Sequence, residues 1–148
     1  MSNGIIFNNR IIDIVFVALF TAQAMKVVIS LIFEKKFNFR KFIETGSMPS
    51  SHTASVVALT TSIGLKEGFS SSMFAISSVF AIVIMYDATG VRRAAGKQAS
   101  VLNKIVANIK KREGYSLIEG NLKELLGHTP LEVLGGMVLG IAISLIMM

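Results

Sequence analysis

Long apolar runs alternate with short polar and basic segments along the chain, and this alternation predicts membrane-spanning helices. Residues 11–33, 69–86 and 131–148 form three such runs, each long enough as a helix to cross about 30 Å of hydrocarbon. Residues 52–65 are less apolar and rich in alanine, serine and threonine, a composition that suits close packing inside a helix bundle. We therefore predict an all-α integral membrane helical bundle of about four spans.

Residues 91–111 combine basic side chains with apolar ones at helical spacing, which favours an amphipathic helix lying at the membrane interface. Gly136 and Gly140 in the last run match a small-x-x-x-small packing pattern, a weak signal by itself. The 148 residues contain no internal repeat, low-complexity tract or linker. We expect residues 1–148 to form a single membrane-embedded domain.

One charged residue stands deep inside the first apolar run. Lys26 must either extend its amine to the membrane surface or face the interior of the bundle. Asp13 lies nearer the end of the run and can reach the interface. The chain has no cysteine, which excludes disulfides and thiolate metal sites.

The net charge of +6 arises in two basic segments, residues 34–41 and 92–123, which flank the apolar runs. Positive charge beside apolar spans indicates contact with anionic headgroups. Nucleic acid is a weaker interpretation, because only two tyrosines and no tryptophan are available for stacking. Four spans place both basic segments on one side, and the positive-inside rule makes that side cytoplasmic.

The two histidines and the two prolines of the chain all lie in two short motifs. The first motif is Gly46-Ser47-Met48-Pro49-Ser50-Ser51-His52, at the start of an apolar helix. Unpaired N–H groups at a helix start favour an anion, and Ser50 and Ser51 would add hydroxyl donors. His52 could then protonate a leaving oxygen. Capping of the helix explains the serines equally well but does not explain the histidine.

The second motif is Gly127-His128-Thr129-Pro130-Leu131-Glu132. Thr129 and Glu132 match a capping box, with proline at the first helical position. Glu132 also lies four residues after His128, where it could orient the imidazole of a nucleophilic histidine. The two roles are hard to combine unless the carboxylate divides its oxygens between two partners.

A third cluster ends the middle apolar run. Arg92 and Arg93 could clamp a phosphate, although adjacent arginines point in different directions on a helix, so we expect one of them, slightly favouring Arg92, to reach a site. Asp87 could pair with an arginine, accept from a histidine or help to bind a metal. The alternative interpretation is a basic cluster that faces lipid headgroups.

At these residues the chain resembles the phosphatidic acid phosphatase type 2 superfamily, which includes vanadium haloperoxidases. It is most similar to a divergent branch of small membrane proteins described as acid phosphatase/vanadium-dependent haloperoxidase-related. That branch is marked by G-x-M-P-S-S-H, D-x-x-G-V-R-R-A-A-G-K-Q-A and G-H-T-P-x-E-V, which here are residues 46–52, 87–99 and 127–133. The likeness covers almost the whole chain.

The resemblance implies that His128 is the nucleophile that becomes phosphorylated and that His52 protonates the leaving group. Glu132 stands where the superfamily has an aspartate. The superfamily's K-x6-R-P motif is missing, and the arginine of its last motif would fall at Leu122. We hypothesise that Arg92, Arg93 or Lys97 replaces these cations. Arg40 and Lys41 are further candidates.

The leading function is hydrolysis of a lipid phosphate or pyrophosphate, with no cofactor and no metal required. One alternative is a non-catalytic membrane protein that binds or moves anionic lipids. A haloperoxidase-like oxidant using bound vanadate ranks low, because the chain is small and membrane-embedded. The expected partners are a phosphorylated lipid and the bilayer of the cell membrane, with the site facing the cytoplasm. Small-residue helix faces would permit a homo-oligomer.

Overall fold

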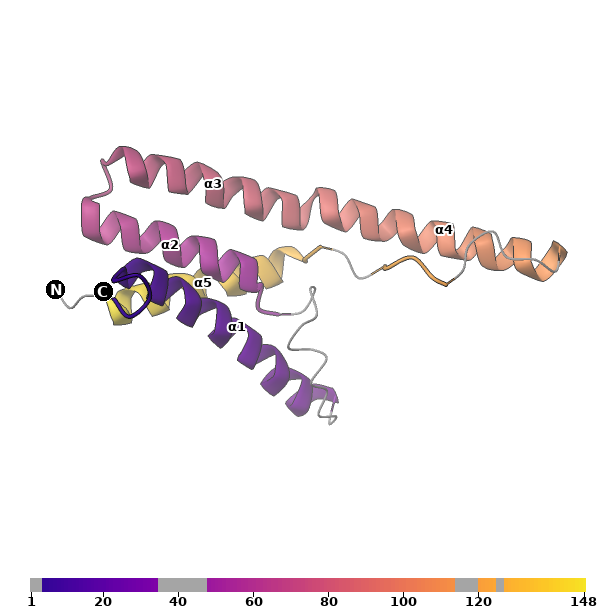
Figure 1. The fold of residues 1–148 in the computed structure, drawn as a ribbon. Coiled ribbons are helices and arrows are strands. Elements are labelled where there is room, and N and C mark those ends of the chain that lie inside the picture. The colour runs from indigo at the N-terminus through magenta and orange to yellow at the C-terminus, as the bar shows by residue number, and fades with distance from the viewer. Residues whose placement is uncertain (1–3, 35–47, 114–119, 125–126) are drawn as a thin grey trace.

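The computed structural model describes residues 4–34, 48–113, 120–124 and 127–148. Those residues form helices and connecting turns, without a strand. The helices are α1 (Arg10–Glu34), α2 (Ser51–Glu67), α3 (Ser72–Thr89), α4 (Val91–Glu113) and α5 (Pro130–Met147) (Figure 1). The all-α prediction is therefore confirmed.

Helix α2 lies at the centre of the bundle and packs against α1, α3 and α5 (Figure 1). The first residues of α1 and the last residues of α5 meet at one end, where Arg10 Nε donates to the Met147 carbonyl over 2.8 Å. Asp13 accepts from the backbone N–H groups of Ile5 and Ile6 at 2.6 and 2.9 Å. The half-buried carboxylate therefore binds the backbone of the segment before α1.

Among the described residues, three helical stretches are long and apolar enough to cross a membrane: Arg10–Ile32, Ser72–Arg112 and Pro130–Met147. The second stretch joins α3 to most of α4. The outward faces of these three stretches carry large apolar side chains, such as Phe20, Val79 and Ile146 at 54, 62 and 82% exposure. Helix α2, the fourth predicted span, has 17 residues and a more polar composition, and it runs between the other three. Apolar side chains outside and small or polar ones inside are what a lipid solvent favours.

The backbones of α2 and α5 are in direct contact because glycine lies at their crossing. A Cβ added to Gly136 would lie 2.5 Å from the Ser50 carbonyl oxygen, and one added to Gly140 would lie 2.5 Å from the Ala54 oxygen. Ser144 Oγ donates to the Ala58 carbonyl at 3.0 Å further along the same contact. The predicted small-x-x-x-small pattern thus forms the contact between these two helices.

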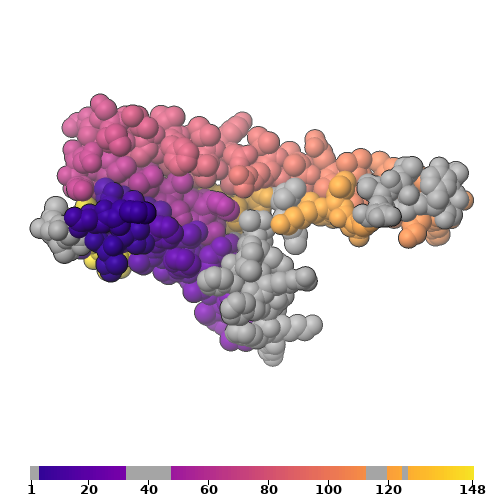
Figure 2. All heavy atoms as spheres, in the orientation of Figure 1, coloured from indigo at the N-terminus to yellow at the C-terminus, as the bar shows by residue number. Residues whose placement is uncertain are grey.

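Helix α4 continues the direction of α3 and extends beyond the end of the bundle, so the molecule is elongated (Figures 1 and 2). It is amphipathic, as predicted. Residues 120–124 lie along it, because the Asn103 side-chain amide binds both the N–H and the carbonyl of Leu122, each at 2.9 Å. Its position relative to a membrane surface stays a prediction.

Replacing Gly140 with alanine should destabilise the protein by about 1–3 kcal/mol, because the new methyl group meets the α2 backbone rather than a flexible side chain. Gly135→Ala is the matched control on the same helix. Its Cβ would meet the side chain of Met48 at 3.2 Å, which can move. Thermal unfolding in detergent, followed by circular dichroism, should show a lower midpoint for Gly140→Ala alone. Equal midpoints for both variants would contradict the tight contact.

Candidate active site

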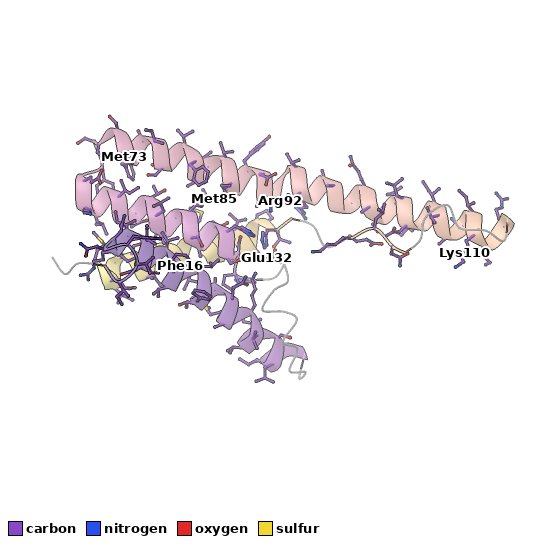
Figure 3. All side chains as sticks on the ribbon, viewed as in Figure 1. Phe16, Met73, Met85, Arg92, Lys110 and Glu132 are labelled. Atoms are coloured by element: carbon purple, nitrogen blue, oxygen red, sulfur yellow. The ribbon has the colours of Figure 1, made fainter. Side chains whose placement is uncertain are left out.

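Residues from all three predicted motifs meet at the end of the bundle where α3 ends and α2 and α5 begin (Figure 3). A small cavity of about 30 Å³ lies there, lined by His52, Ile84, Asp87, Ala88, Arg92 and His128. These side chains come from three segments that are far apart in the sequence. The structure therefore brings both histidines to one cavity, as a shared site requires.

Ser50 and Ser51 play different parts at the start of α2. Ser50 is fully buried and caps the helix, because its Oγ accepts from Thr53 N at 3.4 Å and from Thr53 Oγ1 at 3.0 Å. Its own N–H donates to the Glu132 carbonyl at 2.9 Å, which joins the starts of α2 and α5. Ser51, the next residue, points its hydroxyl toward Lys26. The capping interpretation therefore holds for Ser50.

His128 is held in place by Glu132 and by the α3 backbone. Its side chain is 5% exposed, its Nδ1 lies 3.0 Å from Glu132 Oε2, and its N–H donates to the Ala88 carbonyl at 2.8 Å. Because a carboxylate oxygen accepts, Nδ1 carries the proton in the neutral ring. Nε2 then keeps its lone pair, which is the arrangement a nucleophilic histidine needs.

Glu132 fills both of the roles that its position suggested. Its Oε2 also accepts from Thr129 N at 2.9 Å, while Thr129 Oγ1 accepts from Glu132 N at 3.4 Å, which completes the capping box. The expectation that the carboxylate would have to divide its oxygens was wrong. One oxygen serves the helix cap and the imidazole together, because Thr129 is the residue after His128.

Gly127 allows His128 to approach α3 and α4 closely. It has a φ of +83°, and an added Cβ would overlap the backbone of Arg93. A side chain at this position would therefore need both an unfavourable backbone conformation and a displaced helix start. These two requirements explain why the G-H-T-P motif begins with glycine.

The cations proposed from the sequence lie in different places. Arg92, Arg93 and Lys97 are all exposed, but of these three only Arg92 lines the cavity, where its Nε pairs with Asp87 Oδ2 at 2.5 Å. Lys97 instead borders a larger hollow of about 430 Å³ on α4, together with Gln98, Val101 and Leu102. Arg40 and Lys41 lie outside the described residues.

His52 has an electrostatic environment that favours its neutral form. It is the second residue of α2, outside the three apolar spans. Loss of hydration beside the surrounding protein lowers the pKa of His52 below its usual 6.5, and the charges of Arg92, His128 and Lys26 lower this pKa further. Asp87 acts in the opposite direction. Within the part of the chain that the structure describes, no three metal-ligating side chains gather at one place.

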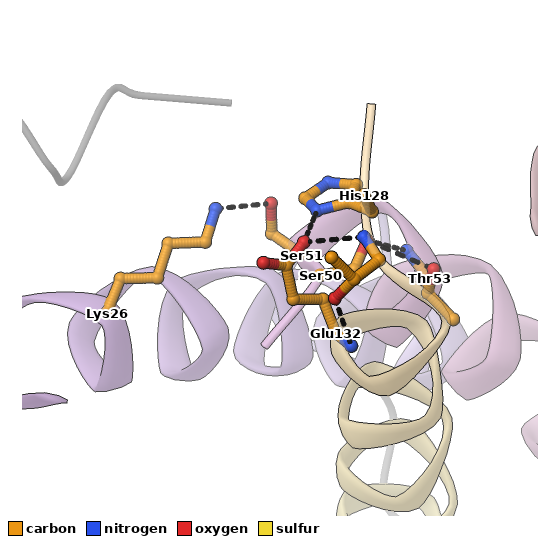
Figure 4. A network of polar contacts seen from close by, with 7 residues as sticks. Lys26, Ser50, Ser51, Thr53, His128 and Glu132 are labelled. Carbon is orange, nitrogen blue, oxygen red and sulfur yellow. Dashed lines mark hydrogen bonds and ion pairs between the residues drawn. The ribbon is translucent and has the colours of Figure 1, made fainter. Parts of the chain in front are cut away.

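One residue at the site was not included in the sequence-based site prediction. Lys26 reaches from the middle of α1 to the start of α2, where its Nζ lies 3.4 Å from Ser51 Oγ (Figure 4). Its side chain is 2% exposed, so it faces the bundle interior rather than extending to the surface. The available signal was the charge itself, inside an otherwise apolar run.

Comparison with known proteins agrees with the motifs. A membrane protein of Bacillus subtilis (strain 168), YuiD, itself described as uncharacterized, is 42% identical over 139 residues, which cover 88% of each chain. No solved structure is detectably similar. The model of the divergent PAP2 family matches residues 7–143. The chain is thus a membrane protein that belongs to the divergent PAP2 family.

Proposed function

We propose that this protein is a membrane-bound hydrolase that removes phosphate from a lipid phosphate or pyrophosphate through a phosphohistidine intermediate. One observation carries the proposal: His128 is bound through Nδ1 to Glu132 and shares a cavity with His52. A buried, oriented imidazole beside a second histidine suits phosphoryl transfer better than it suits lipid binding alone. Membership of a phosphatase-related family supports the same chemistry.

In the first step, His128 Nε2 attacks phosphorus in line with the leaving oxygen. The N–P bond forms as the P–O bond to the lipid breaks, and protonated His52 gives its proton to the departing oxygen. The imidazole of His128 gains positive charge during this step. The carboxylate of Glu132, 3.0 Å from Nδ1, stabilises that charge and keeps the ring in the reactive tautomer.

In the second step, water attacks the phosphorus of the phosphohistidine. Neutral His52 now removes the proton from the water, so the same residue is first an acid and then a base. The P–N bond breaks, inorganic phosphate leaves, and Nε2 recovers its lone pair. No external oxidant, reductant or second substrate besides water is needed.

Arg92 is the described cation best placed to bind the phosphate oxygens. In the structure Asp87 neutralises it, and the cavity of about 30 Å³ is close to the volume of one water molecule. Substrate binding therefore requires Arg92 to turn from Asp87 toward the phosphate. Guanidinium suits this exchange, because it pairs equally well with carboxylate and phosphate. Arg93 and Lys97 lie outside the cavity and are weaker candidates.

The small volume of the cavity favours one alternative, a membrane protein that binds anionic lipids without hydrolysing them. In that case the basic residues hold headgroups and the histidines have no chemical task. The apolar outer faces of α1, α3 and α5 would accept acyl chains in either case. Excess basic residues around the site support its placement at the cytoplasmic face of the cell membrane.

Replacing His128 with alanine should abolish phosphate release, with a loss of roughly a thousandfold or more, because the proposed phosphohistidine can no longer form. The assay is phosphate release by purified protein in detergent from phosphatidate, phosphatidylglycerophosphate, and polyprenyl phosphates and diphosphates. Lys110→Ala, at the far end of α4, is the control and should retain full activity (Figure 3). Equal lipid binding by all three proteins without any release would favour the non-catalytic alternative.

The pH profile of kcat/KM should have an alkaline limb below pH 6.5, because the acid form of His52 is lost as pH rises through its lowered pKa. Arg92→Gln removes one positive charge that lowers this pKa. The limb should therefore move to higher pH, even though the rate itself falls. Arg93→Gln is the matched control, since Arg93 does not line the cavity.

The wild type and both variants are assayed with the same substrate, so titration of the substrate affects all three pH profiles equally. A limb at the same pH in wild type and Arg92→Gln would remove His52 from the role of proton donor. A shift of equal size in Arg93→Gln would instead indicate a general effect of net charge.

A further inference from the structure

Lys26 is a buried cation in a membrane-spanning helix. It lies on the inner face of α1, in line with Ala18 and Ala22, which are both fully buried. An ammonium group within the hydrocarbon region is unfavourable unless it has a partner or a function, and such residues commonly mark binding sites. What the amine of Lys26 faces is therefore informative about the function of this part of the bundle.

The Lys26 amine is directed at the start of α2, next to His52 of the candidate site. Its Nζ donates to Ser51 Oγ at 3.4 Å, and Ser51 is itself 2% exposed (Figure 4). The negative charge of Glu132 attracts the ammonium group. Lys26 arrives from α1, whereas Arg92 arrives from the α3–α4 junction on the other side of α2 (Figure 1). The two cations therefore approach the two histidines from different sides.

A second polar group on α1 is the side chain of Gln23. Gln23 Oε1 is buried and has no hydrogen-bond partner among the described residues. Gln23 and Lys26 are three residues apart, so they share one face of the helix. Buried acceptors are rarely left unsatisfied, and a hydroxyl of a protonated phosphate, or a water bound with it, would satisfy this one.

We propose that Lys26 is a phosphate-binding residue, whose ammonium group and the hydroxyl of Ser51 together bind a non-bridging oxygen of the phosphoryl group. The proposal rests on the proposed function for the location of the phosphate. It also explains how the site works without the K-x6-R-P motif. Lys26 and Arg92 together provide two positive charges around the phosphoryl group, while Glu132 remains committed to His128 and Thr129.

The competing explanation is structural: Lys26 would only balance the charge of Glu132 and hold α1 against α2. The test measures binding of inorganic phosphate and of orthovanadate to the purified full chain in detergent, by titration calorimetry, together with thermal unfolding. Lys26→Met removes the charge and keeps most of the side-chain volume. Lys66→Met is the matched control, because Lys66 is exposed at the other end of α2 from Ser51.

We expect Lys26→Met to weaken phosphate binding by about tenfold or more, as is typical of losing one charge-assisted contact. Lys66→Met should bind as the wild type does, and Lys26→Arg should recover part of the affinity. The same affinity in Lys26→Met and wild type would overturn the proposal, as would a wild type that binds neither anion. If Lys26→Met does not fold, Lys26→Gln is measured instead. Failure of both neutral variants to fold would establish the structural role and overturn the proposal.

These outcomes separate the two proposals. Binding that depends on Lys26, in a protein that hydrolyses no phosphate ester, would retain the anion site and remove the hydrolase. Hydrolysis that depends on His128, with unchanged turnover and phosphate affinity in Lys26→Met, would retain the hydrolase and remove Lys26 from its site.

Discussion

The close approach of α2 and α5 is the contact on which the remainder of the structure depends. Gly136 and Gly140 allow the two backbones to touch, and this contact fixes the start of α5 beside the start of α2. The hydrogen bond from Ser50 N to the Glu132 carbonyl then joins the two starts directly. Because each start carries one histidine motif, the relative position of His52 and His128 follows from a helix contact made of small residues.

The residues that begin the helices are also the residues of the site. Glu132 satisfies the backbone N–H of Thr129 and orients His128 with the same oxygen, so the local fold and the tautomer of the imidazole are fixed together. Ser50 caps α2 and leaves Ser51 facing Lys26. Formation of the two helix starts therefore already orders most of the side chains of the candidate site.

Much of this arrangement could be predicted from the sequence. Apolar runs marked the spanning helices, and the two histidine motifs marked the helix starts, since capping residues act within one turn and leave a local signal. The pairing of Asp87 with Arg92 was one of several open possibilities. The sequence could not choose among them, because a separation of five residues leaves the direction of both side chains undecided.

What the sequence could not supply was contact between distant segments. Lys26 was visibly unusual, yet only the packing of α1 against α2 decides that its amine meets Ser51. The double use of Glu132 Oε2 was likewise out of reach, since it depends on the angle at which the chain enters α5. The composition of α2 did not identify it as a membrane span, because a helix surrounded by other helices does not need an apolar exterior.

The extension of α4 beyond the bundle divides the positive charge of the protein into two electrostatic units. At 1.5 Å per residue, Lys110 stands about 27 Å along the helix from Arg92. Counterions at physiological ionic strength screen charges over about 8 Å, so Lys110, Lys111 and Arg112 have almost no influence on the affinity of the cavity for an anion. The net charge of +6 is therefore a poor guide to the strength of the site. The distal charges attract whatever anionic surface lies near the tip of α4, independently of the candidate site at the other end.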